Sequence, residues 1–317
     1  MKVELYSVGE VLVDMVFKGK SRGEPIVEAH FGGAPANLAI GVSRLGHRAG
    51  FIGAIGNDLL GEFLLRTLRV NDVDTRLVRI KKARTTLAFV VVDERGERRF
   101  FFYRKPWGET ADTMLTVEDV DFERIKEARI VHFSGFSTSY PPTSETVYAI
   151  AEYALKREIK VSYDPTFRED IWPSKNAAKK AFERSLKLST IVSLSVDEME
   201  AFYGTTDYRF VADKILEKHS NVETVAIRLG AKGAYAKSRS GKEAFKEAFK
   251  VKVVDTTGAG DTWTAAFLVS HILEEMDLEY SVTFSNAVAA IVCTKFGATT
   301  AFPKRDEVEE FLRKTLK

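Results

Sequence analysis

The sequence predicts an α/β protein with a mostly parallel central sheet that is flanked by helices on both faces. Short β-rich segments alternate with longer amphipathic segments through the middle of the chain, a rhythm typical of parallel sheets. The 317 residues, 45% of them hydrophobic, are enough to bury one large core. The expected strands are residues 130–133, 160–163, 191–194 and 224–228, and the expected helices are residues 143–157, 176–188, 197–203 and 208–218.

Two regions interrupt this alternation. Residues 11–17 and the strand after a turn at 18–23 are typical of an antiparallel hairpin, as are residues 86–93 and 98–103 around a turn at 94–97. Hairpins inserted between α/β units usually lie outside the main sheet. We therefore expect a single domain over residues 1–317, with insertions at approximately 11–28 and 84–106.

Composition and charge argue against several function classes. The 47 Lys and Arg nearly balance the 45 Asp and Glu, so neither nucleic acid nor a membrane is an expected partner. The N-terminal segment alternates like a strand rather than a signal peptide, and no apolar run reaches transmembrane length, which predicts a cytoplasmic protein. The single cysteine, Cys293, excludes an internal disulfide and is expected to be a buried, inert thiol. Glutamine is absent and asparagine occurs only six times, which fits a thermophilic source.

The segment 255–267, DTTGAGDTWTAAF, carries the strongest chemical signal. A turn containing Gly258 and Gly260 opens a small-residue helix, whose first N–H groups and positive dipole end form an anion site. Asp261 would repel a resting phosphate there unless it removes the proton of an attacking hydroxyl, so the segment indicates phosphoryl transfer. The N–H groups of Ala259, Gly260 and Asp261 would then act as an oxyanion hole. A helix-capping aspartate is the alternative interpretation.

A second glycine cluster, FGGAPANLA at residues 31–39, is followed by Gly41, Gly46, Gly53, Gly56 and Gly61. Together the two segments resemble both signatures of the PfkB (ribokinase-like) carbohydrate kinase family, in the same order and over essentially the whole chain. The resemblance implies a ribokinase-like fold in which the insertions form a small β lid over a sugar. It also implies ATP and Mg²⁺ as cofactors, and places the family's catalytic aspartate at Asp261.

The sugar side of the site is expected near the first signature. Gly32 and Gly33 would let the backbone approach a ligand, Asn37 offers a donor and an acceptor, and Asp14 closes the first strand. The segments around Arg104 and Arg168 resemble elements that fructokinases and 2-keto-3-deoxygluconate kinases use near substrate or phosphate. For each arginine a surface salt bridge is the alternative, and a solvated charge is expected for Lys105.

The nucleotide side is expected at residues 225–233, where VAIRLGAKG resembles the family's loop over the nucleotide and supplies Arg228, Gly230 and Gly233. The resemblance adds Asn286, in an expected helix at 282–294, near adenine. It places Glu198 near hydrated Mg²⁺, although Ser195 replaces the usual asparagine of that motif. It also implies a monovalent cation, K⁺, bound by Asp255, Thr257, Gly297 and Ala301.

Other mechanisms fit the sequence less well. A dinucleotide fingerprint needs a third glycine where Trp263 stands, and neither a P-loop nor a protein-kinase catalytic loop occurs. A non-catalytic sensor on the same fold would be expected to lose Asp261 or the glycine turn. Within the family, residues 31–37, 84–89, 101–104 and 172–174 look most like bacterial fructokinases, which predicts fructose as acceptor and fructose 6-phosphate as product. The alternatives are a 2-keto-3-deoxygluconate kinase or another ribokinase-like kinase.

The lid is also expected to mediate assembly. Phe89, Val91, Phe100 and Phe102 are predicted to share one lid face. Two small hairpins need a second apolar surface. A homodimer formed through the lids is therefore expected.

Overall fold

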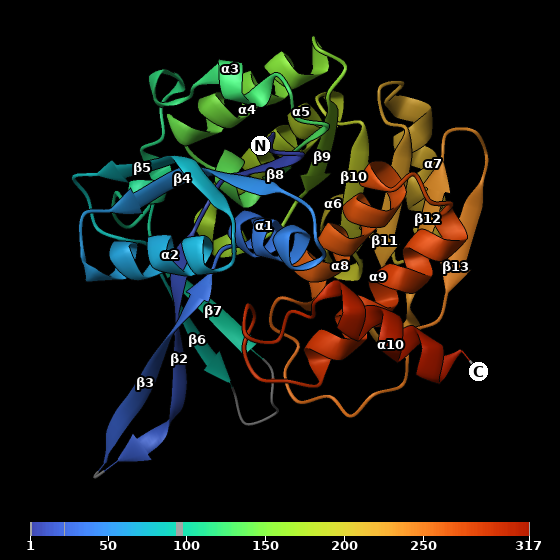
Figure 1. Ribbon diagram of the computed structural model, residues 1–317. Helices are drawn as coiled ribbons and strands as arrows, with labels where there is room; N and C mark the ends of the chain where they lie inside the picture. The colour runs from blue at the N-terminus through green and yellow to red at the C-terminus, as the bar shows by residue number, and fades with distance from the viewer. Residues whose placement is uncertain (1, 22, 93–97, 317) are drawn as a thin grey trace.

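The computed structural model describes residues 2–21, 23–92 and 98–316 (Figure 1). Among these, nine strands form the main sheet in the order β13-β12-β11-β10-β9-β8-β1-β4-β5. The strands from β11 to β5 in this order are parallel, and β12 and β13 add an antiparallel edge. Their bounds are β1 Leu5–Val8, β4 Ala49–Gly56, β5 Asp74–Lys81, β8 Ile130–Ser134, β9 Lys160–Asp164, β10 Ile191–Ser195, β11 Thr224–Arg228, β12 Ala234–Ser238 and β13 Glu243–Lys246.

Helices cover both faces of this sheet, as predicted (Figure 1). One face carries α1 Ala34–Arg44, α2 Leu59–Val70, α8 Ala259–Phe267, α9 Leu278–Cys293 and α10 Arg305–Thr315. The other carries α3 Phe122–Ile125, α4 Thr143–Leu155, α5 Lys175–Lys187, α6 Val196–Tyr203 and α7 Tyr208–Lys218. The predicted strands and helices of the middle region agree with these bounds to within two residues. Helix α9 begins four residues before the expected 282, because the Asp277 side chain caps it by accepting the N–H of Tyr280.

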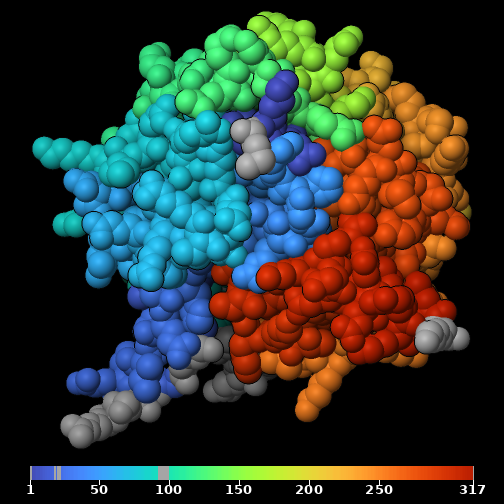
Figure 2. Space-filling model, viewed as in Figure 1, coloured from blue at the N-terminus to red at the C-terminus, as the bar shows by residue number. Residues whose placement is uncertain are grey.

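The insertions form a separate four-stranded sheet, within the described residues, in the order β3-β2-β6-β7. Its strands are β2 Leu12–Ser21, β3 Glu24–Gly32, β6 Leu87–Val92 and β7 Arg98–Tyr103. We call this sheet the lid; its β2–β3 hairpin stands clear of the body (Figures 1 and 2). The turn expected at 18–23 is wrong in extent, because residues 18–21 continue β2 beyond a register shift between Phe17 and Gly19. The turn expected at 94–97 lies outside the described residues.

The pairing of β6 with β7 corrects the expected lid face. Phe89 lies opposite Phe101, and Val90 lies opposite Phe100. Directly opposed residues of an antiparallel pair share one face, and neighbours along a strand alternate. Phe89 and Val91 therefore lie on the face opposite to Phe100 and Phe102, and the prediction that all four share a face is wrong.

In the described part of the chain, no helix combines the length and the apolar character needed to span a membrane.

Candidate active site

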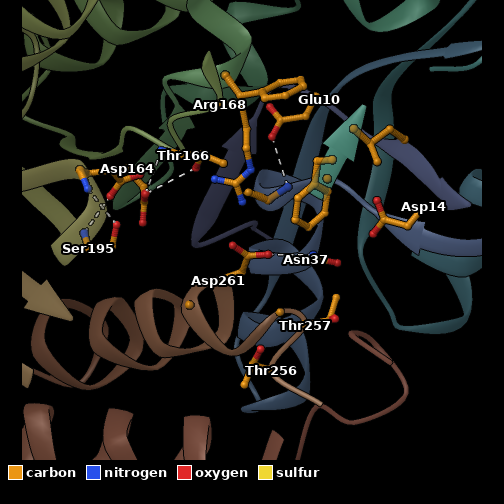
Figure 3. A pocket seen from close by; sticks show the side chains of 18 of the residues that line it. Glu10, Asp14, Asn37, Asp164, Thr166, Arg168, Ser195, Thr256, Thr257 and Asp261 are labelled. Carbon is orange, nitrogen blue, oxygen red and sulfur yellow. Dashed lines mark hydrogen bonds between the residues drawn. The ribbon is translucent and has the colours of Figure 1, made fainter. Parts of the chain in front are cut away.

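Two cavities meet at the carboxyl ends of the parallel strands. The first, of about 370 Å³, lies between the lid and the body and is lined by charged and polar side chains; we call it the polar cavity (Figure 3). The second, of about 750 Å³, is lined mostly by apolar groups of α8, α9 and the loop after β13; we call it the apolar cavity. Both are lined by Ser195, Asp197, Arg228, Thr256 and Gly260. A ligand in one cavity can thus reach a ligand in the other at this shared boundary.

The start of α8 forms part of that boundary. Gly258 caps the helix in the left-handed region at φ 77°, and a Cβ there would lie 2.8 Å from the Phe302 ring. The N–H of Ala259 donates to the Thr256 carbonyl at 3.2 Å, so only two of the three N–H groups expected in the anion hole remain at the helix start. These belong to Gly260 and Asp261, whose position in the first turn gives them no intrahelical acceptor.

The Asp261 carboxylate faces the polar cavity beside Asn37 (Figure 3). Asn37, on α1, donates its amide N–H to Asp261 Oδ2 at 2.8 Å, although 224 residues separate the two in sequence. Burial raises the pKa of Asp261 to about 6; the neighbouring charge of Asp164 adds to this, while the Asn37 hydrogen bond opposes it. A carboxylate with this pKa is ionised at neutral pH and can accept a proton there.

Gly32 and Gly33, the first glycine pair, have different roles in the site. Gly33 lines the polar cavity at φ 107°, and a Cβ there would lie 2.6 Å from the Glu10 carbonyl oxygen. Gly32 is not part of the lining: a Cβ there would lie 2.6 Å from Asp14 Oδ2, so this glycine makes room for the Asp14 carboxylate. Asp14 projects from β2 into the cavity (Figure 3). The buried Asn37 Oδ1 has no hydrogen-bond partner within the described residues and is an acceptor available to a ligand.

The two arginines expected on the sugar side differ in their surroundings. Arg168 lines the polar cavity, stacks 5.2 Å from the Phe100 ring of the lid and lowers the pKa of Asp261. Arg104 does not line the cavity. It is 1% exposed, pairs with Asp112 at 2.9 Å and donates to Ser139 Oγ at 2.8 Å. The expectation of Arg104 as a substrate-binding residue is therefore wrong, because its charge is already neutralised by a buried carboxylate.

Arg228, at the end of β11, is held by a cluster of buried polar groups. Its Nη1 lies within hydrogen-bond distance of Asp164 Oδ2 at 2.6 Å, Ser193 Oγ at 2.5 Å and Thr264 Oγ1 at 2.7 Å. Burial acts to raise the pKa of Asp164, but the charge and hydrogen bond of Arg228 outweigh this and hold the pKa below its usual value. The guanidinium is thus fixed at the boundary of the two cavities, beside Gly260.

Glu198 also lines the polar cavity, and its two oxygens have local donors. Oε1 accepts the N–H of Phe167 at 3.0 Å, and Oε2 accepts the N–H of Ser195 at 2.7 Å. Burial, with the neighbouring charge of Asp164, raises the pKa of Glu198. Ser195 caps α6 by accepting the N–H of Glu198.

The residues expected on the nucleotide side all line the apolar cavity, but some of them are already bonded to or packed against other parts of the protein. Gly230 adopts φ 58° with open space around it, whereas a Cβ on Gly233 would lie 2.0 Å from the Lys246 carbonyl oxygen. Asn286 accepts from Trp263 Nε1 at 2.8 Å and donates to the Lys246 and Glu247 carbonyls at 3.0 and 3.1 Å. Gly233 and Asn286 therefore fix the cavity wall. Cys293, expected to be buried, is only half-buried and lines this cavity, and burial raises the pKa of its thiol.

The residues expected around a monovalent cation lie on two loops that the Asp255 carboxylate joins. Oδ1 accepts the N–H of Thr257 at 2.8 Å, and Oδ2 accepts the N–H of Gly297 at 3.1 Å. Ala301, farther along the second loop, is fully buried. Asp255 thus ties the loop that precedes α8 to the loop in which Gly297 lies.

Comparison with known proteins now decides the family. The pfkB family carbohydrate kinase model matches residues 3–305. The chain belongs to this family. It is 37% identical to Fructokinase-1 of Zea mays over 322 residues, which covers 97% of each protein.

Solved structures agree with the ribokinase-like fold that the sequence predicts. The fructokinase with bound ATP from Xylella fastidiosa superposes with a TM-score of 0.90 at 27% identity, covering 100% of both chains. A double mutant of the fructokinase from Vibrio cholerae O395, in a fructose, ADP and potassium ion bound form, superposes with a TM-score of 0.85 at 27% identity over 98% of each chain. The protein is therefore a carbohydrate kinase of the ribokinase-like fold.

Two site residues of this kinase escaped the sequence interpretation. Glu10 lines the polar cavity two residues after β1 ends, and Asp164 lines it as the last residue of β9. Burial raises the pKa of Glu10 to about 7. The rule that ligands bind beyond the carboxyl ends of parallel strands was the signal for both residues, and it applies equally to Arg228 at the end of β11.

Proposed function

We propose that this carbohydrate kinase transfers the γ-phosphoryl group of ATP to the 6-hydroxyl of fructose. The observation that carries the proposal is the shared boundary of the two cavities, where Gly260 and Arg228 line both and Asp261 lies on the polar side. The fructokinases from Zea mays and Vibrio cholerae, to which the chain is similar over nearly its whole length, support fructose as the acceptor.

In this mechanism Asp261 accepts the proton of the attacking hydroxyl. The Asn37 amide holds the carboxylate through Oδ2, which leaves Oδ1 for the substrate. The N–H groups of Gly260 and Asp261 then stabilise the charge that develops on the transferred phosphoryl group. The protein leaves room for a methyl group on Gly260, with Arg228 Nε 3.6 Å from it, so ligand approach rather than packing accounts for this glycine.

The sugar would lie in the polar cavity under the lid. Asp14 would accept hydroxyl hydrogen bonds from the lid side, and the Asn37 Oδ1 and the Gly33 backbone would bind from the body. Phe100 and Phe102 face the same cavity, where they exclude water that would compete as an acceptor. Arg168, also in the lining, would contact the transferred phosphoryl group.

The nucleotide would lie in the apolar cavity, with the backbone at Gly230 against it and Arg228 near its phosphates. Mg²⁺ would supply charge neutralisation to those phosphates. Among the described residues no cluster of three His, Cys, Asp or Glu side chains could hold a metal, which fits an ion bound chiefly through phosphates and water, with Glu198 behind it. A K⁺ bound by carbonyls of the loops around Thr257, Gly297 and Ala301 would stiffen the turn before α8.

A keto-deoxy sugar acid is the alternative acceptor, because Arg168 offers a cation to its carboxylate in the polar cavity. Arg104, which could have served as a second carboxylate ligand, is paired with Asp112. Arg228, the other arginine in the lining, is paired with Asp164. With both Arg104 and Arg228 neutralised by carboxylates, the site favours a neutral sugar.

The partner proposed for the lid is a second copy of the chain. The lid face that carries Phe89 points away from the polar cavity and includes Phe17, Phe101 and Tyr103, which are 36%, 51% and 63% exposed. An exposed aromatic surface of this kind is a candidate for burial in a symmetric dimer.

The deciding experiment is a screen of ADP release with fructose, ribose, 2-keto-3-deoxygluconate, glucose and inositol. Fructose should give the highest kcat/KM, with the phosphate on the 6-hydroxyl. Asp261→Asn should bind fructose and ATP but lose turnover by about 10² or more, the scale of lost general-base catalysis. A hundredfold preference for the keto-deoxy acid would overturn the substrate, and near-normal turnover of Asp261→Asn would overturn the mechanism.

A further inference from the structure

The lid joins the body at four places: before β2, after β3, before β6 and after β7. Two buried carboxylates, those of Glu10 and Asp112, lie at these junctions, and each residue is 2% exposed. Burying a carboxylate is costly unless several donors satisfy it. The groups that bond to or pair with these two carboxylates come from the lid junctions and from the adjoining body.

Glu10 holds both junctions of the first hairpin. It lies two residues before β2, and its Oε1 accepts the N–H of Ala34, two residues after β3 ends, at 3.2 Å. Its Oε2 accepts the hydroxyls of Ser134 at 2.6 Å and Ser137 at 2.5 Å. These serines belong to the end of β8 and to the short helical turn Phe136–Thr138 in the body. One side chain thus ties the start and the end of the β2–β3 hairpin to the main sheet.

Asp112 holds both junctions of the second hairpin in the same way. Its Oδ1 accepts the hydroxyl of Thr86, the residue before β6, and its Oδ2 pairs with Arg104, the residue after β7, at 2.9 Å. The Thr110 hydroxyl adds a bond to Oδ1 at 2.8 Å. The Asp112 carbonyl accepts the hydroxyl of Thr143 at the start of α4, which anchors this group to the body.

The turn Phe136–Thr138 connects the two groups. On one side Ser137 bonds to Glu10, and on the other Ser139 accepts Arg104 Nη1 at 2.8 Å. The Arg104 guanidinium lies 4.4 Å from the centre of the Phe136 ring, which lines the polar cavity. A displacement at either carboxylate would therefore reach the wall of the polar cavity.

We propose that Glu10 and Asp112 are positioning residues of this kinase. Each fixes the two junctions of one lid hairpin, and together they set the place of Asp14 on the lid relative to Asn37 and Asp261 on the body. An apolar side chain would fill the same space, but only acceptors bonded in several directions fix the angle at which a hairpin leaves the body. The effect on sugar binding rests on the proposed function; the effect on lid order does not.

The test uses substitutions that keep size and remove charge, and reads lid order and binding rather than turnover. In Asp112→Asn, amide hydrogen exchange should speed up by about tenfold in β6 and β7. The substitution removes the negative charge that pairs with Arg104 at the end of this hairpin. In Glu10→Gln, compared with wild type at pH 8, where Glu10 with its pKa of about 7 is ionised, the same should occur in β2 and β3. In both variants the dissociation constant for fructose, measured without nucleotide, should rise by about tenfold, and that for ATP should stay within about twofold.

Asp119→Asn is the matched control, because Asp119 forms a half-buried ion pair with Lys81 in the body, and its other bonds within the described residues are to Thr116. It should change neither lid exchange nor fructose binding. If Asp112→Asn fails to fold, Arg104→Met, which removes the same ion pair, replaces it, and Arg104→Lys should restore part of the protection.

Exchange that rises equally in the lid and in β8 and β9, or not at all, would overturn the proposal. So would equal losses of fructose and ATP binding. A wild-type protein that binds no sugar refutes the proposed function instead, and leaves the exchange experiment as the test of the two carboxylates.

Discussion

The Asp261 carboxylate is buried in the site, where its ionised form is disfavoured although the proposed mechanism needs that form. Burial and the nearby Asp164 both disfavour its ionised form, while the Asn37 amide and the charges of Arg228 and Arg168 favour it. The result is a carboxylate, the proposed base, whose pKa of about 6 lies closer to neutrality than that of an ordinary aspartate. Such a base binds a transferred proton more strongly than a carboxylate at its usual pKa.

This pKa predicts the acid limb of the pH profile. Asp261 acts as a base only when it is deprotonated, so kcat/KM should fall as the pH drops through about 6. Protonation of Glu10, whose pKa is about 7, should begin this fall through weaker fructose binding. Well below the pKa the fall should approach about tenfold per pH unit, since the active fraction then follows the proton concentration. Steady-state kinetics from pH 4.5 to 8 would measure it. The residual activity of Asp261→Asn should lack this limb, and a limb that persists there would assign the ionisation to another group.

The two glycines of the α8 turn should respond oppositely to alanine. Gly260→Ala adds a methyl group where the protein has room, so the free energy of unfolding should stay within about 1 kcal/mol of wild type while kcat falls. Gly258→Ala places a Cβ in a left-handed conformation and 2.8 Å from Phe302, so it should lose at least about 1 kcal/mol of stability. Urea unfolding and turnover, measured on both variants, separate the two effects. Full activity in Gly260→Ala would refute close ligand approach at that position.

At the scale of single elements, α6 begins directly after Ser195, where the resemblance to the family led us to expect an asparagine. Ser195 caps this helix and shares a capping box with Glu198, so its structural role is complete without a metal. Asparagine caps helices as well as serine does, and its longer side chain extends farther into the shared boundary of the cavities.

Ser195→Asn should therefore fold with unchanged stability and lower the Mg²⁺ concentration needed for half-maximal activity. Ser195→Ala is the control: it should lose about 1 kcal/mol through the missing cap. Thermal unfolding and a Mg²⁺ titration of activity measure both. An unchanged Mg²⁺ requirement in Ser195→Asn would show that the serine is not a substitute for the family's asparagine in holding the cation.

Local sequence patterns predicted helices and strands far better than they predicted which side chains bond to one another in the folded protein. The alternation of strands and helices, and the turn before α8, depend on contiguous residues. The middle of the sheet and the position of Asp261 at the start of α8 could therefore be predicted. Arg104 is taken out of the site by its bonds to Asp112 and Ser139. Asn286 is likewise bonded to Trp263 and Lys246. Only the folded chain brings these residues together. The face of Phe100 depends on the register of β6 with β7, and a one-residue difference reverses it.

At the scale of the whole molecule, the lid presents two different faces. Phe100 and Phe102 line the polar cavity. The ring of Phe102 packs against that of Phe136 in the body, with 5.1 Å between the ring centres. On the other face the ring of Phe89 packs near two others, with ring centres 6.1 Å from that of Phe17 and 5.0 Å from that of Tyr103. Because the first face belongs to the site, only the second is available for assembly.

This division predicts that assembly and sugar binding can be separated. Phe101→Ser with Tyr103→Ser removes exposed aromatic surface from the outer face, and should convert the proposed dimer to a monomer in sedimentation at micromolar concentration. Phe100→Ser, on the inner face, should raise the KM for fructose and leave the sedimentation coefficient unchanged. The outer-face variant should raise this KM as well, but less, because a lid without its partner is less ordered. A wild-type chain that sediments as a fully active monomer would contradict the dimer, and dissociation caused by Phe100→Ser would contradict the assignment of the two faces.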